Sequence, residues 1–467
     1  MAPGTPLPKS ELLFFASLLL GELSIAVMAK AMHMKGDRTF VAFLPSNPGM
    51  VFLVAIAVFL VVGAVLIWQY LANRRAPSRQ FRLIVMMNLV TVLLILVTGE
   101  IAIRIVTRSS PEGEKFGSVV LKAKNWEMVA LRYRQIIEKA SGQLSPYIIY
   151  DDLMGWTVGP KRRSAEGLYW SSSEGIRAPR EGVSFAKARR KTEIALVGDS
   201  YTFGEEVRYE DTWGSLLDKA LGPEFQVLNF GVPGYGVDQA YLRYEKDVRQ
   251  WKPDVVIFGF ISHDAFRTMV VYPFLNFPDW DHPFSKPRLI LHEGDLVRMN
   301  VPPLAPDAIF SRGSIHELPF LKYDIGYRQS DWQRSFYHLS YLARLFVSWY
   351  PRWPAVTPDL SEEALVSLNA SILKAFVQSV AQTGTIPLVV YFPGKQEFEK
   401  PSSSPGGRRA RRVLQEAGIA YTDPTSCLLG VNPADRFAPG SHYTPEGNAA
   451  VAKCLLNVVR QALAQAS

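Results

Sequence analysis

Three long apolar stretches come before residue 110, at positions 12–28, 50–71 and 83–106. Each is near the roughly 20 residues that an α-helix needs to cross a bilayer, and none has a regular polar face. No small-residue cleavage site follows the first stretch, which therefore predicts a retained helix and not a signal peptide. The pattern predicts a membrane domain over residues 1–108 with three transmembrane helices, and hence a lipid bilayer as partner.

The short loops predict the orientation of these helices. The loop between the second and third spans carries four arginines, Arg74, Arg75, Arg79 and Arg82. Basic loops stay in the cytoplasm, so the amino terminus is expected inside and the chain after about Ile105 outside. Three basic residues in the preceding loop, Lys30, Lys35 and Arg38, oppose this assignment. Two carboxylates within the apolar spans, Glu22 and Glu100, are costly there and are a functional hypothesis by default.

After a polar, partly helical stalk at 109–146, the pattern changes to short apolar strands that alternate with helices. Expected strands are 194–197, 225–229, 255–260, 387–392 and 419–423, and expected helices are 211–221, 238–251, 329–349, 361–382, 408–417 and 445–463. This alternation predicts an α/β domain over 147–467 with a mostly parallel sheet. Residues 272–328 lack clear periodicity and read as a long insertion, typical of a lid or binding loop. Its aromatic residues Phe274, Phe277 and Trp280 either pack the loop down or stack on a sugar.

Composition narrows the classes of function. The chain is 48% hydrophobic with a net charge of +8. Much of the basic excess lies beside apolar segments, so it indicates membrane topology, and no nucleic acid partner is expected. Two cysteines, Cys427 and Cys454, are too few for a disulfide framework or a four-ligand zinc site. Two buried free thiols are the favoured interpretation, and one bridge in an oxidising compartment is the alternative. No metal or other cofactor is expected.

Candidate chemistry lies at the ends of the predicted strands. The strand 194–197 stops at Gly198-Asp199-Ser200, a strand–turn–helix corner that can hold a serine hydroxyl at the carboxyl edge of a parallel sheet. An ordinary turn with a serine near the helix start is the alternative. A serine nucleophile needs a base such as His442. The oxyanion needs donors, for which the backbone N–H groups of Ser200 and Gly231 and a side chain such as His263 are candidates.

The order of these residues resembles a known family. Gly198-Asp199-Ser200, then Gly231 in NFGVPGYG, then a polar residue before Asp264, then His442 in SHYTPEGN are similar to the SGNH (GDSL-type) hydrolases, over residues 147–463. The resemblance implies a flavodoxin-like three-layer α/β/α sandwich and ester hydrolysis or acyl transfer, often on acetylated carbohydrate. It implies Ser200 as nucleophile and His442 as base. It points to membrane-anchored bacterial members and thus to the inner membrane, with the domain periplasmic or extracellular.

Two positions depart from the family pattern. His263 stands where the family has an asparagine oxyanion donor, although a histidine can still donate one N–H. The family also has an aspartate shortly before the catalytic histidine, where this chain has Pro439 and Gly440. Losing that partner costs about 10⁴ in a serine protease. Either Asp435 from the same loop substitutes, or Ser200 and His442 work as a dyad. Asp199 is expected to be structural.

Two hypotheses follow from the sequence. The first is a membrane-tethered esterase or O-acyl(acetyl)transferase that acts on an acylated extracytoplasmic glycan through Ser200 and His442. The second is a degenerate SGNH-like domain that serves as a structural or binding subunit beside other subunits of a membrane complex. The missing asparagine and aspartate, and three spans where one would tether, motivate the second.

Overall fold

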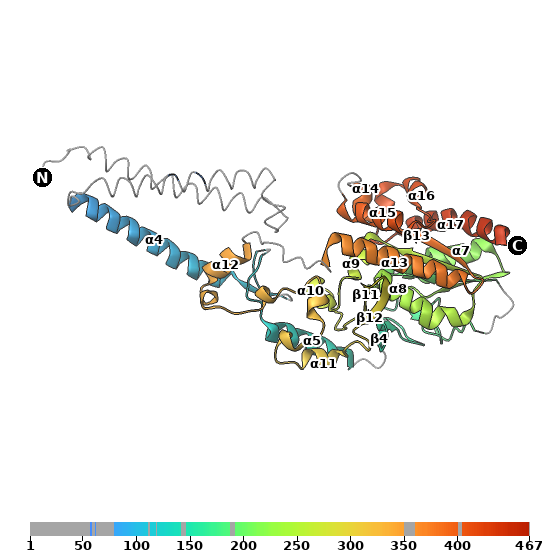
Figure 1. Ribbon diagram of the computed structural model, residues 1–467, viewed down its shortest axis with the longest axis horizontal. Helices are drawn as coiled ribbons and strands as arrows, with labels where there is room; N and C mark the ends of the chain where they lie inside the picture. Colours follow the sequence, from blue (N-terminus) through green and yellow to red (C-terminus); the bar gives the residue numbers. More distant parts are fainter. Residues whose placement is uncertain are drawn as a thin grey trace. The chain divides into compact units, whose positions relative to one another are not determined.

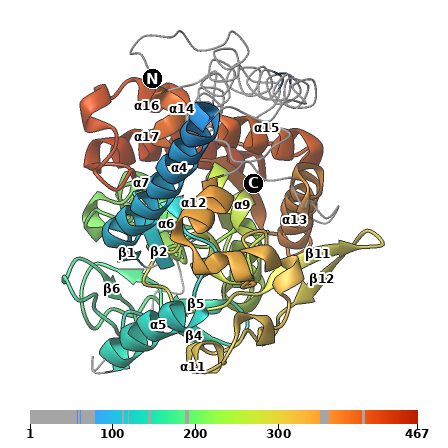
Figure 2. The ribbon, with the colours of Figure 1, turned by 90° about the vertical axis from the view of Figure 1, so that its left-hand side faces the viewer.

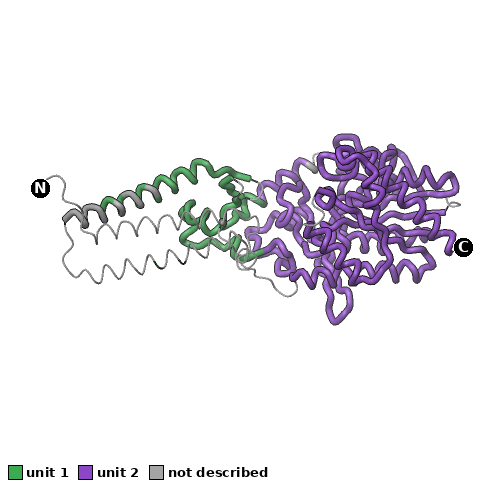
Figure 3. Tube along the Cα trace, turned by 90° about the horizontal axis from the view of Figure 1, so that it is seen from above, with its two compact units in different colours: residues 1–129, 328–355 green, residues 130–327, 356–467 purple. Residues whose placement is uncertain are grey.

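The structure is a computed structural model that describes most of the chain beyond residue 78. The described residues are 57, 61, 79–110, 113–117, 119–141, 146–186, 192–349, 360–399 and 404–466. The chain forms two compact units, shown in Figure 3. One comprises residues 1–129 and 328–355, and the other, which we call the α/β unit, comprises 130–327 and 356–467. The sequence-based boundary at 146/147 therefore differs from the division in the structure, which returns residues 328–355 to the first unit.

A four-stranded parallel sheet forms the centre of the α/β unit. Its order is β13-β10-β8-β9, with β8 (Thr192–Val197), β9 (Phe225–Asn229), β10 (Val255–Phe260) and β13 (Ile386–Tyr391). The expected strand at 419–423 is reduced to one parallel bridge between Val390 and Thr422. The other expected strands are confirmed, because buried runs of β-branched and aromatic residues favour parallel strands covered on both faces.

Helices cover both faces of this sheet, as Figure 1 shows. Successive residues of β8 point to opposite faces. Ala195 and Val197 join a core with α8 (Val237–Arg243), α9 (Ser262–Arg267), α13 (Glu362–Ala381) and α15 (Pro405–Ala417). Ile194 and Leu196 join a second core with α7 (Trp213–Leu221), α16 (Thr425–Leu429) and α17 (Pro445–Ala466). The predicted three-layer α/β/α architecture is confirmed.

The insertion at 272–328 has more regular structure than its sequence pattern indicates. It contains α10 (Pro273–Asn276), α11 (Pro306–Phe310) and the antiparallel hairpin of β11 (Arg288–His292) and β12 (Asp295–Met299), which extends at one edge in Figure 2. Phe274 is buried and packs against Tyr133 and Phe310. For Phe274, packing inside the domain is therefore the correct alternative. Two further hairpins, β4 (Ile148–Asp151) with β5 (Gly155–Val158) and β6 (Trp170–Ser171) with β7 (Arg177–Ala178), precede β8.

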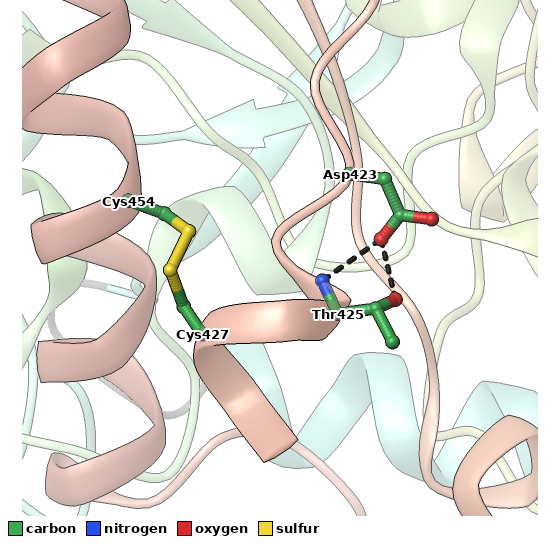
Figure 4. The surroundings of a disulfide bond; sticks show 4 residues. All are labelled: Asp423, Thr425, Cys427 and Cys454. Atoms are coloured by element: carbon green, nitrogen blue, oxygen red, sulfur yellow. Dashed lines mark hydrogen bonds between the residues drawn. A yellow bond between two sulfur atoms is a disulfide. The ribbon is translucent and has the colours of Figure 1, made fainter. Parts of the chain in front are cut away.

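The cysteines correct one expectation. Cys427 in α16 and Cys454 in α17 form a disulfide, drawn in Figure 4, where the favoured interpretation was two free thiols. Nothing in the local sequence pairs them, because they lie 27 residues apart. Packing of α16 on α17 brings their Cα atoms to 6.1 Å, which is within the range that a disulfide spans.

In the first unit, Glu100 organises the polar contacts of α4 (Arg79–Val106). Its carboxylate accepts hydrogen bonds from the backbone N–H groups of Tyr341 and Leu342, at 2.9 and 2.8 Å, and from the hydroxyl of Ser340 at 2.8 Å. The N–H groups of Tyr341 and Leu342 are the first two of α12 (Tyr341–Trp349), which have no partner within the helix. The predicted helix 329–349 therefore begins only at Tyr341, after two 3₁₀ turns. The same unit holds the small sheet β1 (Arg108–Ser110), β2 (Gly113–Phe116) and β3 (Val119–Val120).

The predicted membrane spans remain predictions. Spans 12–28 and 50–71 lie outside the described residues, apart from Ala57 and Val61, and 83–106 falls within α4. By length and composition, one helix in the described part of the chain could cross a membrane, namely α13. Half of that stretch is buried inside the protein, as expected of a core helix.

Candidate active site

A tight corner places Ser200 at the carboxyl end of β8. Gly198 is required there, because a Cβ atom would lie 2.2 Å from the Thr202 hydroxyl oxygen and 2.4 Å from the carbonyl oxygen of Gly259. Asp199 caps the short helix α6 (Ser200–Phe203) by accepting a hydrogen bond from the Tyr201 N–H at 2.9 Å. Ser200 is thus the first residue of that helix, and its side chain is fixed by the corner.

The structure brings His442 to this serine. The imidazole Nε2 lies 2.9 Å from the Ser200 hydroxyl oxygen, although the residues are 242 positions apart. The Tyr201 hydroxyl donates to the carbonyl of Ser441 at 2.6 Å, and the Tyr201 ring lies 5.1 Å from the imidazole. Tyr201 therefore holds the histidine loop against the helix that carries the serine. The 2.9 Å between the Ser200 hydroxyl oxygen and Nε2 of His442 is within the reach expected of a nucleophile and its base.

Glu206 provides the carboxylate that the sequence lacked near His442. Its Oε2 lies 2.8 Å from Nδ1 and accepts the backbone N–H of His442 at 3.1 Å, while its Oε1 accepts the N–H of Gly440 at 2.7 Å. Burial raises the pKa of this carboxyl, but these hydrogen bonds outweigh it and hold the pKa below its ordinary value. An ionised carboxylate at Nδ1 orients the ring and leaves Nε2 free to accept a proton.

Asp435 and the dyad alternative are both corrected by this contact. Asp435 ends an exposed 3₁₀ turn (Pro433–Asp435), and its backbone carbonyl accepts the Thr444 hydroxyl. The family pattern predicts the acid close to His442 in the sequence, whereas Glu206 lies close to Ser200 in the sequence and reaches His442 only in space. Gly204 and Glu206 both have positive φ, of 77° and 69°, and this reverses the chain after α6. The acidic pair Glu205-Glu206, five and six residues after Ser200, is the sequence signal that could have indicated it.

Two of the predicted oxyanion donors, Gly231 and His263, differ in their surroundings. The N–H of Gly231 donates to the Asn229 side-chain oxygen at 3.0 Å, so in this state it is engaged. Gly231 itself is required, because a Cβ atom would lie 2.5 Å from the Phe203 nitrogen. His263 is exposed on α9, and partial desolvation followed by the charges of Arg267 and Arg409 lowers its pKa. A neutral His263 retains one N–H to donate.

A buried arginine ties the site loops together. Arg267 lies 2.6 Å from an Asp264 oxygen, 3.7 Å from an Asp199 oxygen and donates to the Tyr235 carbonyl at 3.1 Å. Burial raises the pKa of both carboxyls, and for Asp264 the neighbouring Asp199 raises it further. Asp199 thus contacts Arg267 and caps α6, and the Ser200 hydroxyl also lies 3.4 Å from one of its carboxylate oxygens, so its structural role stays a prediction. Within the residues that the structure describes, no cluster of three His, Cys, Asp or Glu side chains is arranged to hold a metal ion.

Comparison with protein families decides what this arrangement is. Residues 194–283, which contain the Ser200 corner, Gly231 and His263, match the model of the GDSL-like lipase/acylhydrolase family. Over these residues the α/β unit, called the hydrolase unit from here on, is a member of the SGNH (GDSL-type) hydrolases. No curated protein matches the chain.

Solved structures similar to this chain include a lipase/acylhydrolase and two acetyl xylan esterases. A lipase/acylhydrolase from Enterococcus faecalis is 15% identical and covers 58% of this chain and 95% of its own, with a TM-score of 0.30. An acetyl xylan esterase from Geobacillus stearothermophilus is 14% identical, and the match covers 57% of this chain and 93% of the esterase, with a TM-score of 0.29. A second acetyl xylan esterase, AlAXEase, is 14% identical, and the match covers 57% of this chain and 99% of that esterase, with a TM-score of 0.32.

Proposed function

We propose that the protein is a serine ester hydrolase or acyltransferase that acts through Ser200, His442 and Glu206. The observation that carries this proposal is the continuous contact from the Ser200 hydroxyl to Nε2 at 2.9 Å and from Nδ1 to Glu206 at 2.8 Å. Nucleophile, base and orienting carboxylate in this order are the recurring arrangement of serine hydrolases.

The geometry supports a two-step reaction. Nε2 takes the Ser200 proton while the oxygen attacks the ester carbonyl, and the imidazolium then protonates the departing alcohol. Glu206 stabilises that imidazolium. The Ser200 N–H and the His263 side chain are the proposed oxyanion donors, and the Gly231 N–H joins them by sharing its bond to Asn229. Water or a sugar hydroxyl then takes the acyl group from Ser200, and these acceptors distinguish hydrolysis from transfer.

We also propose that the enzyme is tethered to a bacterial inner membrane and acts outside the cytoplasm on an acylated glycan. The disulfide supports this location, because disulfides persist in oxidising compartments. Exposed apolar side chains on α4, including Met86, Val90, Leu93 and Val97, support the membrane contact. The alternative of a non-catalytic subunit loses one of its motives, because Glu206 supplies the acid at His442 that the sequence pattern lacks. The missing asparagine and the three predicted spans remain as its other motives.

Labelling of Ser200 tests the proposal. We expect a fluorophosphonate probe to label the purified chain in detergent, and labelling to be lost in Ser200→Ala and strongly reduced in His442→Ala. A folded wild-type chain that takes no label would favour the non-catalytic subunit, and proteins that co-purify with it would then be identified.

A further inference from the structure

A second carboxylate, Glu205, lies at the other nitrogen of the His442 ring. Its Oε2 is 3.4 Å from Nε2, the nitrogen that also faces the Ser200 hydroxyl. The Glu205 backbone is fixed, because its N–H donates to the carbonyl of Ser200 at 3.0 Å. The side chain retains 32% exposure, so a bound molecule can reach it. The triad does not use this carboxylate, because Glu206 already occupies Nδ1.

The reaction places the substrate alcohol beside Glu205. Nε2 must hand its proton to the leaving oxygen, which therefore comes within hydrogen-bond distance of Nε2, roughly 3 Å. A Glu205 oxygen 3.4 Å from the same nitrogen is a neighbour of that leaving oxygen. A substituent on the next carbon of the alcohol then comes within reach of the carboxylate.

The charges around Glu205 select the kind of substituent. Burial raises the pKa of the Glu205 carboxyl, and the charges of Asp199 and Glu206 raise it further, while His442 and Arg267 lower it. Whether protonated or ionised, the carboxyl keeps an oxygen that accepts a hydrogen bond. A neutral hydroxyl therefore fits this position, and an anionic group is disfavoured by the same negative charges that raise the pKa of Glu205.

Resting on the proposed function, we propose that Glu205 is a specificity residue that accepts a hydrogen bond from a hydroxyl next to the scissile ester. The enzyme then prefers esters of neutral polyhydroxy alcohols, such as sugars, over esters of simple or acidic alcohols. Glu205 adds no covalent step: the proton still passes from Ser200 to Nε2 and on to the alcohol oxygen.

A matched pair of esters tests this inference with the full chain in detergent. The esters are 2-hydroxyethyl acetate and 2-methoxyethyl acetate, which share the acyl group and differ in that a methyl group replaces the hydroxyl hydrogen, the only donor. We expect wild-type kcat/KM to favour the hydroxyl ester on the order of tenfold to a hundredfold, the range of a hydrogen bond to a charged group. We expect the ratio to fall to about 1 in Glu205→Ala and to an intermediate value in Glu205→Gln. Acetoxyacetate, with a carboxylate in place of the CH2OH group, is expected to be the poorest wild-type substrate.

Glu206→Gln is the matched control, because it should lower kcat/KM for both esters by the same factor and leave their ratio unchanged. A wild-type ratio near 1, or a ratio that survives Glu205→Ala, would overturn the inference. A chain whose Ser200 takes the probe but which turns over neither ester would overturn it too, while the triad would stand. A wild-type chain that takes no probe would instead remove the proposed function and the inference together.

Discussion

Each nitrogen of the His442 ring faces a carboxylate from one dipeptide, Glu205-Glu206. Glu206 accepts three hydrogen bonds from the histidine loop, two of them from backbone N–H groups. It therefore both orients the imidazole and holds the loop in place. Glu205, at 3.4 Å, has no such role in the fold of the loop. Two chemically identical neighbours thus make different contacts with the same ring, Glu206 at Nδ1 and Glu205 at Nε2.

For Glu206→Gln we expect kcat to fall by roughly 10²- to 10⁴-fold, because the ring loses the charge that orients and stabilises the imidazolium. Folded wild-type Glu206 has a depressed pKa, so its contribution to stability is present above the ordinary glutamate pKa and is lost as pH falls below it. Denaturant unfolding from pH 7 to pH 3 should therefore show a smaller loss of stability in Glu206→Gln. If the free energy of unfolding falls equally in both proteins between pH 7 and pH 3, the pKa of Glu206 is not depressed. If kcat is unchanged in Glu206→Gln, Glu206 is not part of the triad.

At the scale of elements, the site depends on three turns that follow β8, β9 and β10. Their parallel arrangement brings the three turns to one edge of the sheet. Arg267 then joins them through Asp199, Tyr235 and Asp264. The turn after β8 is the tightest constraint, because α6 packs directly on the neighbouring strand at Gly259. A side chain at Gly198 cannot be added without moving the serine.

We expect Gly198→Ala to destabilise the domain by about 1–3 kcal/mol, as overpacking does, and to abolish probe labelling of Ser200. Gly394→Ala is the control, since its added Cβ would meet its nearest atom only at 3.9 Å. Denaturant unfolding and probe labelling of both variants check this. Full labelling of a Gly198→Ala protein would show that the corner tolerates a methyl group.

At the scale of the whole molecule, the chain combines an SGNH unit with a second unit that contains α4 and α12. Residues 328–355 return to that unit after the insertion, so the two units are interleaved in sequence. Exposed apolar residues of α4 and the disulfide of the hydrolase unit are the two features that bear on location. They lie in different units and lead to the same expectation.

In intact cells, we expect Cys427 and Cys454 to resist thiol alkylation until a reductant is added, and the chain to stay in the membrane fraction after alkaline carbonate extraction. An oxidising compartment preserves the disulfide, so no free thiol is available to the reagent. Alkaline carbonate releases proteins that are held at the membrane surface by charge, whereas helices that span the bilayer stay in the membrane. Alkylation of Cys427→Ser, which leaves one free thiol, is the control for probe access. Thiols that react without reductant would place the domain in the cytoplasm.

The sequence by itself determined the four strands of the parallel sheet, the α/β class of the fold and the choice of Ser200 and His442 as candidate residues. Buried β-branched runs, turn residues and alternation are local patterns, and each acts within a few residues. The tertiary structure alone decided the acid, the disulfide and the second unit. Glu206 reaches His442 across 236 positions, and Cys427 meets Cys454 only because two helices pack. Contacts of this kind depend on how distant elements meet in space, which no local pattern records.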